Sequence, residues 1–239
     1  LEVSDEIKHD YFREISNLAP ELGLSALGVT NAEPFVETRR EIERRKSEGF
    51  DGGMQFTFRN PERSTTPKMI MKDAKSLIVG ALRTPSPRLE EASADKLRIA
   101  AYARKDYYSN LRKALNVIAE RLKADGWKAQ VVADENSLVD RAAAIRAGIG
   151  WHGKNGNVLI PGKGSWFVLG TVVTNADLPA SKQVQDNCGT CKRCIDNCPT
   201  GAIIEPGVVD ARRCIAWLVQ APGVIPNEYR KSIGNRIYG

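Results

Sequence analysis

The stretch Cys188-Gly-Thr-Cys191-Lys-Arg-Cys194-Ile-Asp-Asn-Cys198-Pro199 dominates any interpretation of this chain. It has the pattern C-x2-C-x2-C-x3-C-P, the spacing with which bacterial ferredoxins bind 4Fe–4S clusters. In that pattern three thiolates bind one cluster, and the fourth, before the proline, binds the other cluster of a pair. A zinc site usually takes two separated Cys or His pairs, and a disulfide framework belongs to short secreted chains. We therefore interpret the four cysteines as iron–sulfur ligands, which predicts a protein that transfers electrons.

A fifth cysteine, Cys214, lies outside this pattern. Two clusters that each take four thiolates need three more ligands than the five cysteines in these 239 residues provide. The sequence begins with Leu1 rather than Met and stops at Gly239 without a terminal helix, a charge run or a polar tail. We expect the natural chain to continue, above all beyond Gly239.

Length and composition indicate a full hydrophobic core and a small additional module, because 42% of the 239 residues are hydrophobic. No apolar stretch approaches the roughly 20 residues that span a bilayer. The N-terminus is polar and acidic, unlike a signal peptide, and the pair Arg39-Arg40 is followed by charged residues, unlike a twin-arginine signal. Every cysteine is a candidate cluster ligand, as expected in a reducing compartment. We predict a cytoplasmic protein without a membrane segment.

The net charge of +6 permits binding to a polyanion without establishing it. Basic residues gather toward the end of the sequence: Arg212, Arg213, Arg230, Lys231 and Arg236. Most proteins with such a charge bind no nucleic acid, so the charge by itself leaves an anionic partner open.

Helices and strands alternate up to about residue 180 and predict an α/β domain over residues 1–180. Helical spacing of apolar residues indicates helices from a cap at Ser4 to residue 18, and over 33–46, 106–125 and 138–147. Strands are expected at 24–29, 76–82, 127–132 and 166–174. The run 76–82 is continuously apolar, which is typical of a strand buried on both faces. Residues 180–187 form a polar linker into a second domain, 181–239.

Neither a G-x-G-x-x-G motif after a strand nor a P-loop is present. Glycines gather instead in the segment 147–157, with Gly162 and Gly164 just beyond. Such a segment lets backbone approach a large flat or phosphorylated ligand, so we interpret it as a cofactor cradle. The alternative is a long surface loop, since loops concentrate glycine.

Several blocks together resemble the epoxyqueuosine reductase family, cobalamin- and iron–sulfur-dependent enzymes of queuosine tRNA modification. They lie at residues 60–67, 74–79, 132–141, 146–155, 164–170 and 233–239, beside the cysteines. The strings G-K-N, G-S-W-F and I-G-N-R-I-Y-G are specific in combination, and the resemblance covers nearly the whole chain.

The resemblance implies a nitroreductase-like α/β (α+β) domain that binds cobalamin, followed by a ferredoxin-like domain with two 4Fe–4S clusters. Cys188, Cys191 and Cys194 would bind the cluster nearer the corrin, with a fourth ligand beyond Gly239. Cys198 and Cys214 would bind the outer cluster. The family continues after that glycine with C-x2-C-x3-C and a helical-repeat tail. Asp134 corresponds to the family's proton donor, and further cofactor contacts are expected from Arg63, Asp134, Arg141, Lys154, Asn155, Asn157 and Ser165.

Taken alone, these residues leave alternatives open. Asp134 follows an apolar strand and can simply cap a helix. Arg141 either orients Asp134 or forms a surface salt bridge. The chain has two histidines, His9 and His152, and neither lies in the D-x-H-x-x-G motif of histidine-ligated cobalamin proteins. We therefore expect a corrin without a protein histidine ligand and interpret His152 as a cradle or loop residue, with axial ligation as its alternative.

The chain departs from the family where D-Y-H usually follows a glycine, because here Tyr107 and Tyr108 follow Lys105-Asp106. We interpret Tyr108 as a packing residue. Trp217 and Gln220, near Cys214, either meet the nucleotide or, for the tryptophan, lie in the core.

The resemblance implies reduction of epoxyqueuosine to queuosine at the tRNA wobble position. Removing the epoxide oxygen needs two electrons, which clusters can relay singly, and a proton from an acid. The implied partners are the tRNA anticodon stem-loop and a low-potential donor such as ferredoxin or flavodoxin, with a monomeric enzyme. Alternatives are a reductive dehalogenase-like corrinoid enzyme and an electron-transfer or corrinoid-reactivating protein. A ferredoxin needs only about 60–80 residues, so the large upstream domain argues against a simple carrier.

Overall fold

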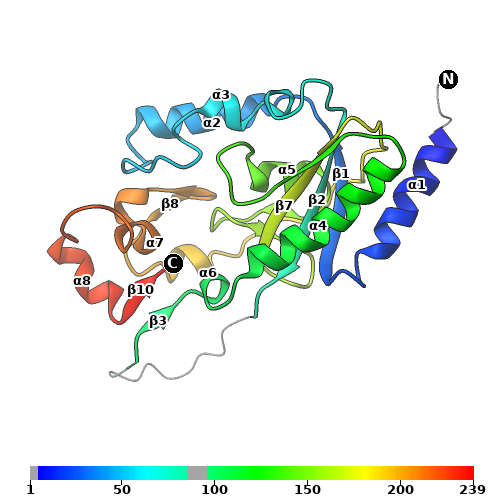
Figure 1. Ribbon diagram of the computed structural model, residues 1–239. Helices are drawn as coiled ribbons and strands as arrows, with labels where there is room; N and C mark the ends of the chain where they lie inside the picture. The colour runs from blue at the N-terminus through cyan, green and yellow to red at the C-terminus, as the bar shows by residue number, and fades with distance from the viewer. Residues whose placement is uncertain (1–4, 86–95) are drawn as a thin grey trace.

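The computed structural model describes residues 5–85 and 96–239 (Figure 1). Its centre is a four-stranded sheet in the order β1-β2-β7-β4, in which all neighbouring strands are antiparallel. The strands are β1 (Leu24–Asn31), β2 (Ser76–Arg83), β7 (Phe167–Thr174) and β4 (Ala129–Val132). All but the last two residues of β2 are buried, which confirms that this apolar run lies inside the protein.

Helix α4 (Tyr107–Ala124) packs on one face of this sheet together with α1 (Asp5–Leu18) (Figure 1). The apolar positions predicted for α4 are fully buried: Leu111, Leu115, Ile118 and Leu122. Two strand glycines let the helix lie close to the sheet. A Cβ atom at Gly170 would be 2.8 Å from Leu115 Cδ1, and one at Gly80 would be 2.9 Å from Leu115 Cδ2.

A second core lies on the opposite face of the sheet. There α5 (Asp140–Arg146) contacts β1, β2 and β7, while α2 (Val36–Ser47) contributes Ile42 and leads toward α3 (Pro61–Ser64). The small residue Ala143 is fully buried, which allows α5 to approach the strands closely. The first part of the chain is therefore a mixed α/β structure with helices on both faces of an antiparallel sheet.

The cysteine region consists of short elements. They are α6 (Arg193–Asp196), β8 (Ile203–Glu205), β9 (Val208–Val209), η3 (Ala211–Arg213), α7 (Ile215–Leu218), α8 (Asn227–Ile233) and β10 (Arg236–Tyr238). The remaining short elements are η1 (Pro67–Met69), β3 (Arg98–Ile99), η2 (Ala101–Ala103), β5 (Trp151–His152) and β6 (Val158–Leu159). β5 pairs with β6, and β8 pairs with β9, both antiparallel. β10 pairs in parallel with β3, so the end of the described chain returns to the α/β part (Figure 1).

Most predicted elements are confirmed, with shifts at their ends. Asp106 begins α4 as expected, because its carboxylate accepts the backbone N–H of Ser109 at 2.8 Å. The strand predicted from residue 127 begins at Ala129, since the N–H of Lys128 donates to the Asn175 side chain at 2.8 Å instead of to a neighbouring strand. The helix predicted at 33–46 begins at residue 36, and the one predicted at 138–147 begins at residue 140. The cap predicted at Ser4 lies outside the described residues.

The predicted linker is coil and adheres to the sheet. The Ser181 N–H donates to the Val29 carbonyl at 2.9 Å, and the Ser181 hydroxyl accepts the Val29 N–H at 2.9 Å. The division into domains at residue 180 stays a prediction. Within residues 5–85 and 96–239, no helix combines the length and apolar character that a membrane crossing requires.

Candidate functional site

Asp134 lies in a turn between β4 and α5, with its side chain exposed. Its φ of 55° is the one positive φ of a non-glycine residue in the described part of the chain. Asp and Asn tolerate this left-handed region better than most residues, and such conformations gather at functional sites. The N-cap of α5 is Val139, which makes no side-chain cap. Asp134 is therefore no helix cap, and that alternative is wrong.

Asp140, the first residue of α5, lies close enough to this turn for its carboxyl group to interact electrostatically with Asp134. Burial, and then the charge of Asp134, raise the pKa of Asp140 to about 8, although Arg141 opposes the shift. Burial also raises the pKa of Tyr108, followed by the charges of Asp134 and Asp140. The pKa of Tyr102 is raised by burial, by Tyr238 and by Asp134. We call Tyr102, Tyr108, Asp134 and Asp140 the Asp134 cluster.

Arg141 connects this cluster to the glycine-rich segment, since its Nη1 donates to the Gly156 carbonyl at 3.1 Å. Solvent reaches part of the side chain, yet the surrounding protein desolvates the guanidinium enough to lower its pKa, against the opposing charges of Asp140 and Tyr108. The contact that the structure gives Arg141 is thus to backbone rather than a surface salt bridge.

The glycine-rich segment packs mainly against the protein itself. A Cβ atom at Gly148 would be 2.2 Å from the Lys182 carbonyl oxygen, and one at Gly150 would be 2.1 Å from that of Leu159. These glycines serve close backbone packing, which explains their number without a ligand. We call residues 150–157 the bridging loop. Its use as a cofactor cradle stays a prediction.

Three predicted contact residues lie in the bridging loop. Lys154 Nζ donates to the Gly189 carbonyl at 2.7 Å, so it meets the cysteine segment. Asn155 Oδ1 accepts the N–H of Asn157 at 3.0 Å, which stabilises the turn. The structure therefore brings Lys154, Asn155 and Asn157 together with Arg141.

Arg63 and Ser165 lie at the border of this group. Arg63 is exposed in α3, and the carbonyl of its neighbour Ser64 accepts the Val139 N–H at 2.9 Å, next to the start of α5. Ser165 precedes β7 at the end of the sheet where the antiparallel β4 also ends. Both residues thus lie at the side of the molecule that carries Asp134, and their contacts to a cofactor stay predictions.

The cysteine segment offers sulfur atoms that accept N–H groups. Trp151 Nε1 donates to Cys188 Sγ at 3.5 Å. The pKa of Cys198 is lowered: burial raises it, but backbone N–H groups of Ile203, Thr200 and Ala202 outweigh burial, and the Ala202 nitrogen is 3.2 Å from Sγ. Donors directed at sulfur stabilise the thiolate, which is the form that binds metal. The donor set therefore fits a cluster ligand.

The five cysteines differ in exposure. Cys191 is exposed, while Cys188, Cys194, Cys198 and Cys214 are partly buried. Within the described ranges, no three or more Cys, His, Asp or Glu side chains are already grouped as around a metal ion. Convergence of the sulfurs on clusters stays a prediction.

His152, in the bridging loop, lies against the turn from β8 to β9. A Cβ atom at Gly207 would be 2.7 Å from His152 Cε1, so the imidazole packs on that turn. Arg45 Nη2 donates to the Gly207 carbonyl at 3.2 Å in the same place. Burial lowers the pKa of His152, and the charges of Arg45 and Arg141 lower it further. The structure gives this histidine, in β5, a packing contact, and its role at a cofactor stays a prediction.

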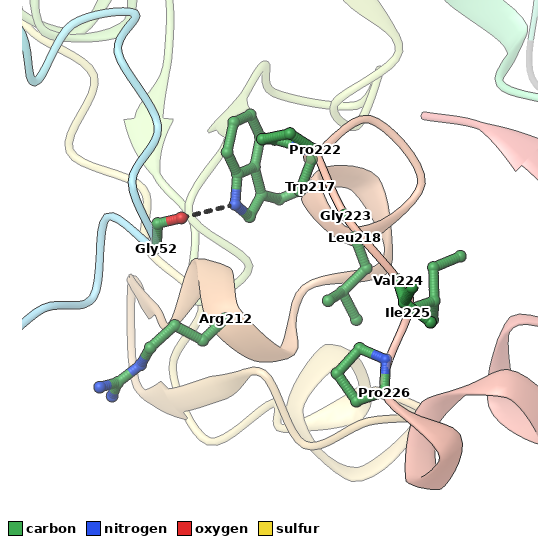
Figure 2. A pocket seen from close by; sticks show the side chains of 10 residues that line it. Gly52, Arg212, Trp217, Leu218, Pro222, Gly223, Val224, Ile225 and Pro226 are labelled. Atoms are coloured by element: carbon green, nitrogen blue, oxygen red, sulfur yellow. Dashed lines mark hydrogen bonds between the residues drawn. The ribbon is translucent and has the colours of Figure 1, made fainter.

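A surface pocket near Cys214 was not predicted (Figure 2). It is lined by Gly52, Arg212, Trp217, Leu218 and the segment 221–226. Trp217 Nε1 donates to the Gly52 carbonyl at 3.0 Å, so this tryptophan lines the pocket with a satisfied N–H. Gln220 Nε2 donates to the Ala216 carbonyl in the preceding helix, α7. No motif signals the pocket, because its lining comes from a loop without a repeating pattern.

Sequence reasoning also missed Asp140, Tyr102 and Trp151. Asp140 reads as an ordinary first-turn acid of a helix. Tyr102 enters the site from a short 3-10 helix, and Trp151 reads as a bulky residue in a glycine-rich loop. The one available signal for Asp140 and Trp151 was their position within the matched blocks, and Tyr102 lies outside them.

Comparison with known proteins shows relatives that match nearly the whole chain. The 4Fe-4S double cluster binding domain family matches residues 187–239. Epoxyqueuosine reductase of Bacillus cereus is 38% identical over 226 residues, which are 91% of this chain and 59% of the relative. That of Xanthomonas campestris pv. campestris is 35% identical over 248 residues, covering 96% of this chain and 67% of the relative. The chain thus spans about three fifths of the length of the Bacillus relative.

Solved structures give the same answer. An epoxyqueuosine reductase in complex with an epoxyqueuosine-modified tRNA-Tyr stem loop superposes with a TM-score of 0.88 at 34% identity, covering 96% of this chain and 62% of that chain. A B12-dependent reductive dehalogenase has a TM-score of 0.52 at 17% identity over 82% of this chain and 24% of that chain, which shows a shared fold only. Together, the cysteine pattern, the Asp134 turn and these relatives place the chain in the epoxyqueuosine reductase family.

Proposed function

We propose that this protein reduces epoxyqueuosine to queuosine at the wobble position of tRNA. Membership of the family supports the reaction, and a relative solved with an epoxyqueuosine-modified stem loop supports the substrate. The anticodon stem-loop is then the part of the tRNA that meets the Asp134 cluster.

The observation that carries the proposal is the bridging loop, which lies between an acid and the cysteine segment. On one side, Arg141 Nη1 donates to Gly156 next to the Asp134 cluster. On the other side, Lys154 Nζ donates to Gly189, and Trp151 Nε1 donates to Cys188 Sγ. A proton source and the predicted entry point of electrons are thus joined through eight consecutive residues. Reductive removal of oxygen requires both at one place.

Cobalamin is part of the proposal, supported by the dehalogenase-like fold and by the exposed polar residues around the bridging loop. Its periphery carries amides and a phosphate, which suit cationic and amide side chains. We propose that Arg63, Asp134, Arg141, Lys154, Asn155, Asn157 and Ser165 contact it. When bound, cobalamin supplies a metal that becomes a strong nucleophile on reduction.

Two 4Fe–4S clusters complete the proposal, in accord with the matched double-cluster family. Cys188, Cys191 and Cys194 bind the cluster nearer the bridging loop, and Cys198 and Cys214 bind the second. The N–H groups directed at Cys188 and Cys198 support thiolate ligation in each.

The residues of this chain then have defined tasks. Converting an epoxide to an alkene takes two electrons and two protons, and the oxygen leaves as water. Asp134 donates the proton that the epoxide oxygen needs as its bond to carbon breaks. Burial raises the pKa of Asp140 to about 8, so this neighbour keeps its own proton at neutral pH.

The remaining features of the proposal concern the whole protein. An antiparallel sheet with helices on both faces supports a nitroreductase-like architecture for residues 1–180. A low-potential carrier such as ferredoxin or flavodoxin delivers the electrons, and the enzyme works as a cytoplasmic monomer.

Anaerobic turnover tests the reaction. Full-length protein reconstituted with iron, sulfide and cobalamin is given a chemical reductant and an epoxyqueuosine-containing anticodon stem-loop. We expect a product that has lost one oxygen atom. A parallel reaction with a halogenated phenol tests the dehalogenase alternative. Release of halide together with an unchanged stem-loop would contradict the proposed function.

A further inference from the structure

The indole of Trp151 reaches a cysteine of the predicted cluster from the other part of the molecule. Trp151 belongs to β5, whereas Cys188 opens the cysteine pattern 37 residues later. The donor Nε1 is 3.5 Å from Cys188 Sγ, a hydrogen-bond distance for sulfur. Trp151 is partly buried, so water competes only partly for its N–H.

The surrounding contacts fix the indole relative to the sulfur. Trp151 pairs with Leu159 of β6, and the missing side chain at Gly150 permits this close pairing. From the cysteine side, the Gly189 carbonyl accepts Lys154 Nζ at 2.7 Å. The carbonyl of Lys154 also accepts the Gly207 N–H at 3.0 Å. Lys154 therefore makes two hydrogen bonds between the bridging loop and the cysteine region. The Trp151–Cys188 contact is therefore set by the packing of the two parts rather than by a free side chain.

A donor at a ligating sulfur has a defined electrostatic effect. Reduction adds negative charge to a cluster and to its thiolates, and an N–H dipole directed at sulfur stabilises that charge. Hydrogen bonds to the sulfurs are accordingly among the factors that set the potential of an iron–sulfur cluster, and residues outside the ligand set tune a metal site. Removing such a donor makes the cluster harder to reduce.

We propose that Trp151 is a positioning residue that raises the reduction potential of the cluster bound by Cys188, through its indole N–H. The proposal rests on the cluster assignment in the proposed function, and it does not depend on the tRNA reaction. It gives the α/β part of the molecule a direct influence on electron supply.

Replacing Trp151 by benzothienylalanine tests the idea, because sulfur takes the place of the N–H while the ring shape is kept. Full-length protein with reconstituted clusters is titrated electrochemically and followed by electron paramagnetic resonance. We expect a more negative midpoint potential for one cluster, outside the error of the titration, at wild-type iron content. Trp151→Phe is a second variant that lacks the donor and is expected to shift the potential in the same direction.

Trp127→Phe is the matched control, because Trp127 packs beside the core under α4, away from the cysteines. It should leave both potentials unchanged. An unchanged potential in the iron-loaded benzothienylalanine protein would overturn the role of Trp151 alone. Wild-type protein that binds no iron after reconstitution would instead contradict the cluster assignment itself.

Discussion

The backbone N–H of Val139 donates to the Ser64 carbonyl at 2.9 Å, so α3 supports the start of α5 beside the turn that presents the proposed proton donor. Asp134 adopts a left-handed conformation with φ of 55° and has an exposed side chain. A strained turn needs such support, because the conformation costs about 1–3 kcal/mol and persists only where surrounding contacts determine it.

The partly buried Asp140 carboxyl makes stability depend on pH. The folded protein keeps this proton up to about pH 8, whereas an unfolded chain releases it at about pH 4. The folded state therefore binds the extra proton between these values, and its stability falls as pH rises through the window, by at most about 1.4 kcal/mol per pH unit. Thermal unfolding midpoints measured between about pH 5 and 8 should decline more steeply in the wild type than in Asp140→Asn.

Asp106→Asn is the matched control for this experiment. Asp106 caps α4, and Asn caps a helix about as well, so the variant should keep the wild-type dependence on pH. Identical slopes in wild type and Asp140→Asn would show that Asp140 does not hold a proton in the folded state.

Iron content tests the two-cluster arrangement. Full-length protein reconstituted anaerobically should bind about eight iron atoms, since two four-iron clusters follow from the ligand pattern. Colorimetric iron analysis against a quantitative protein determination checks this number. About four iron atoms per chain in the wild type would contradict the second cluster, and so would the same iron content in wild type and Cys198→Ser.

The basic residues near the end of the chain divide into two kinds. Arg212 pairs with the buried Asp210 at 2.8 Å, and Arg236 Nη1 donates to the carbonyls of Ser232 and Ile233, so both support the fold. Arg230 and Lys231 are exposed on α8, so they are better placed for tRNA phosphates, and Arg230 also donates through Nε to the Ile225 carbonyl at 2.9 Å.

The double variant Arg230→Ala/Lys231→Ala should bind the stem-loop more weakly. Its affinity should also depend less on salt, with a slope reduced by about 0.7–0.9 for each lost phosphate contact. Fluorescence anisotropy over a salt series measures both quantities. Lys113→Ala, an exposed change on α4, serves as the control. Equal slopes in the double variant and the control would place the tRNA contact elsewhere.

Gly170→Ala should crowd the core next to the Asp134 turn and destabilise the protein. The new methyl group would be 2.8 Å from Leu115 Cδ1 and 2.9 Å from Ala133 Cβ, so either α4 or the residue before Asp134 must move. Overpacking of this kind typically destabilises a protein by about 1–3 kcal/mol. Urea unfolding measures the change, and wild-type stability would mean that the sheet absorbs a methyl group without strain.

Local patterns predicted the elements well, and pairings between distant segments poorly. The apolar run in β2 and the helical spacing of apolar residues in α4 indicate which positions are buried. A buried strand reads the same in parallel and antiparallel sheets, so the strand directions could not be inferred. The pairing of β10 with β3 joins segments more than a hundred residues apart and has no sequence signal.

The same division holds for the site. The cysteine spacing and Asp134 carry chemical patterns that the family resemblance identifies. Asp140 acquires its role from burial and from the nearby charge of Asp134, and Trp151 acquires its role from packing of the bridging loop on the cysteine segment. Such roles depend on burial and contact geometry, which residue types alone do not determine.

Asp134→Asn tests the central claim most directly, because asparagine tolerates a left-handed backbone and can still accept hydrogen bonds but has no acidic proton. Both cofactors should remain bound, as checked by visible and paramagnetic resonance spectra before the reaction. Single-turnover reduction of an epoxyqueuosine-containing stem-loop should slow by about 10²–10⁴, the typical loss for a general acid. Turnover of the Asn variant at the wild-type rate would remove Asp134 from the mechanism.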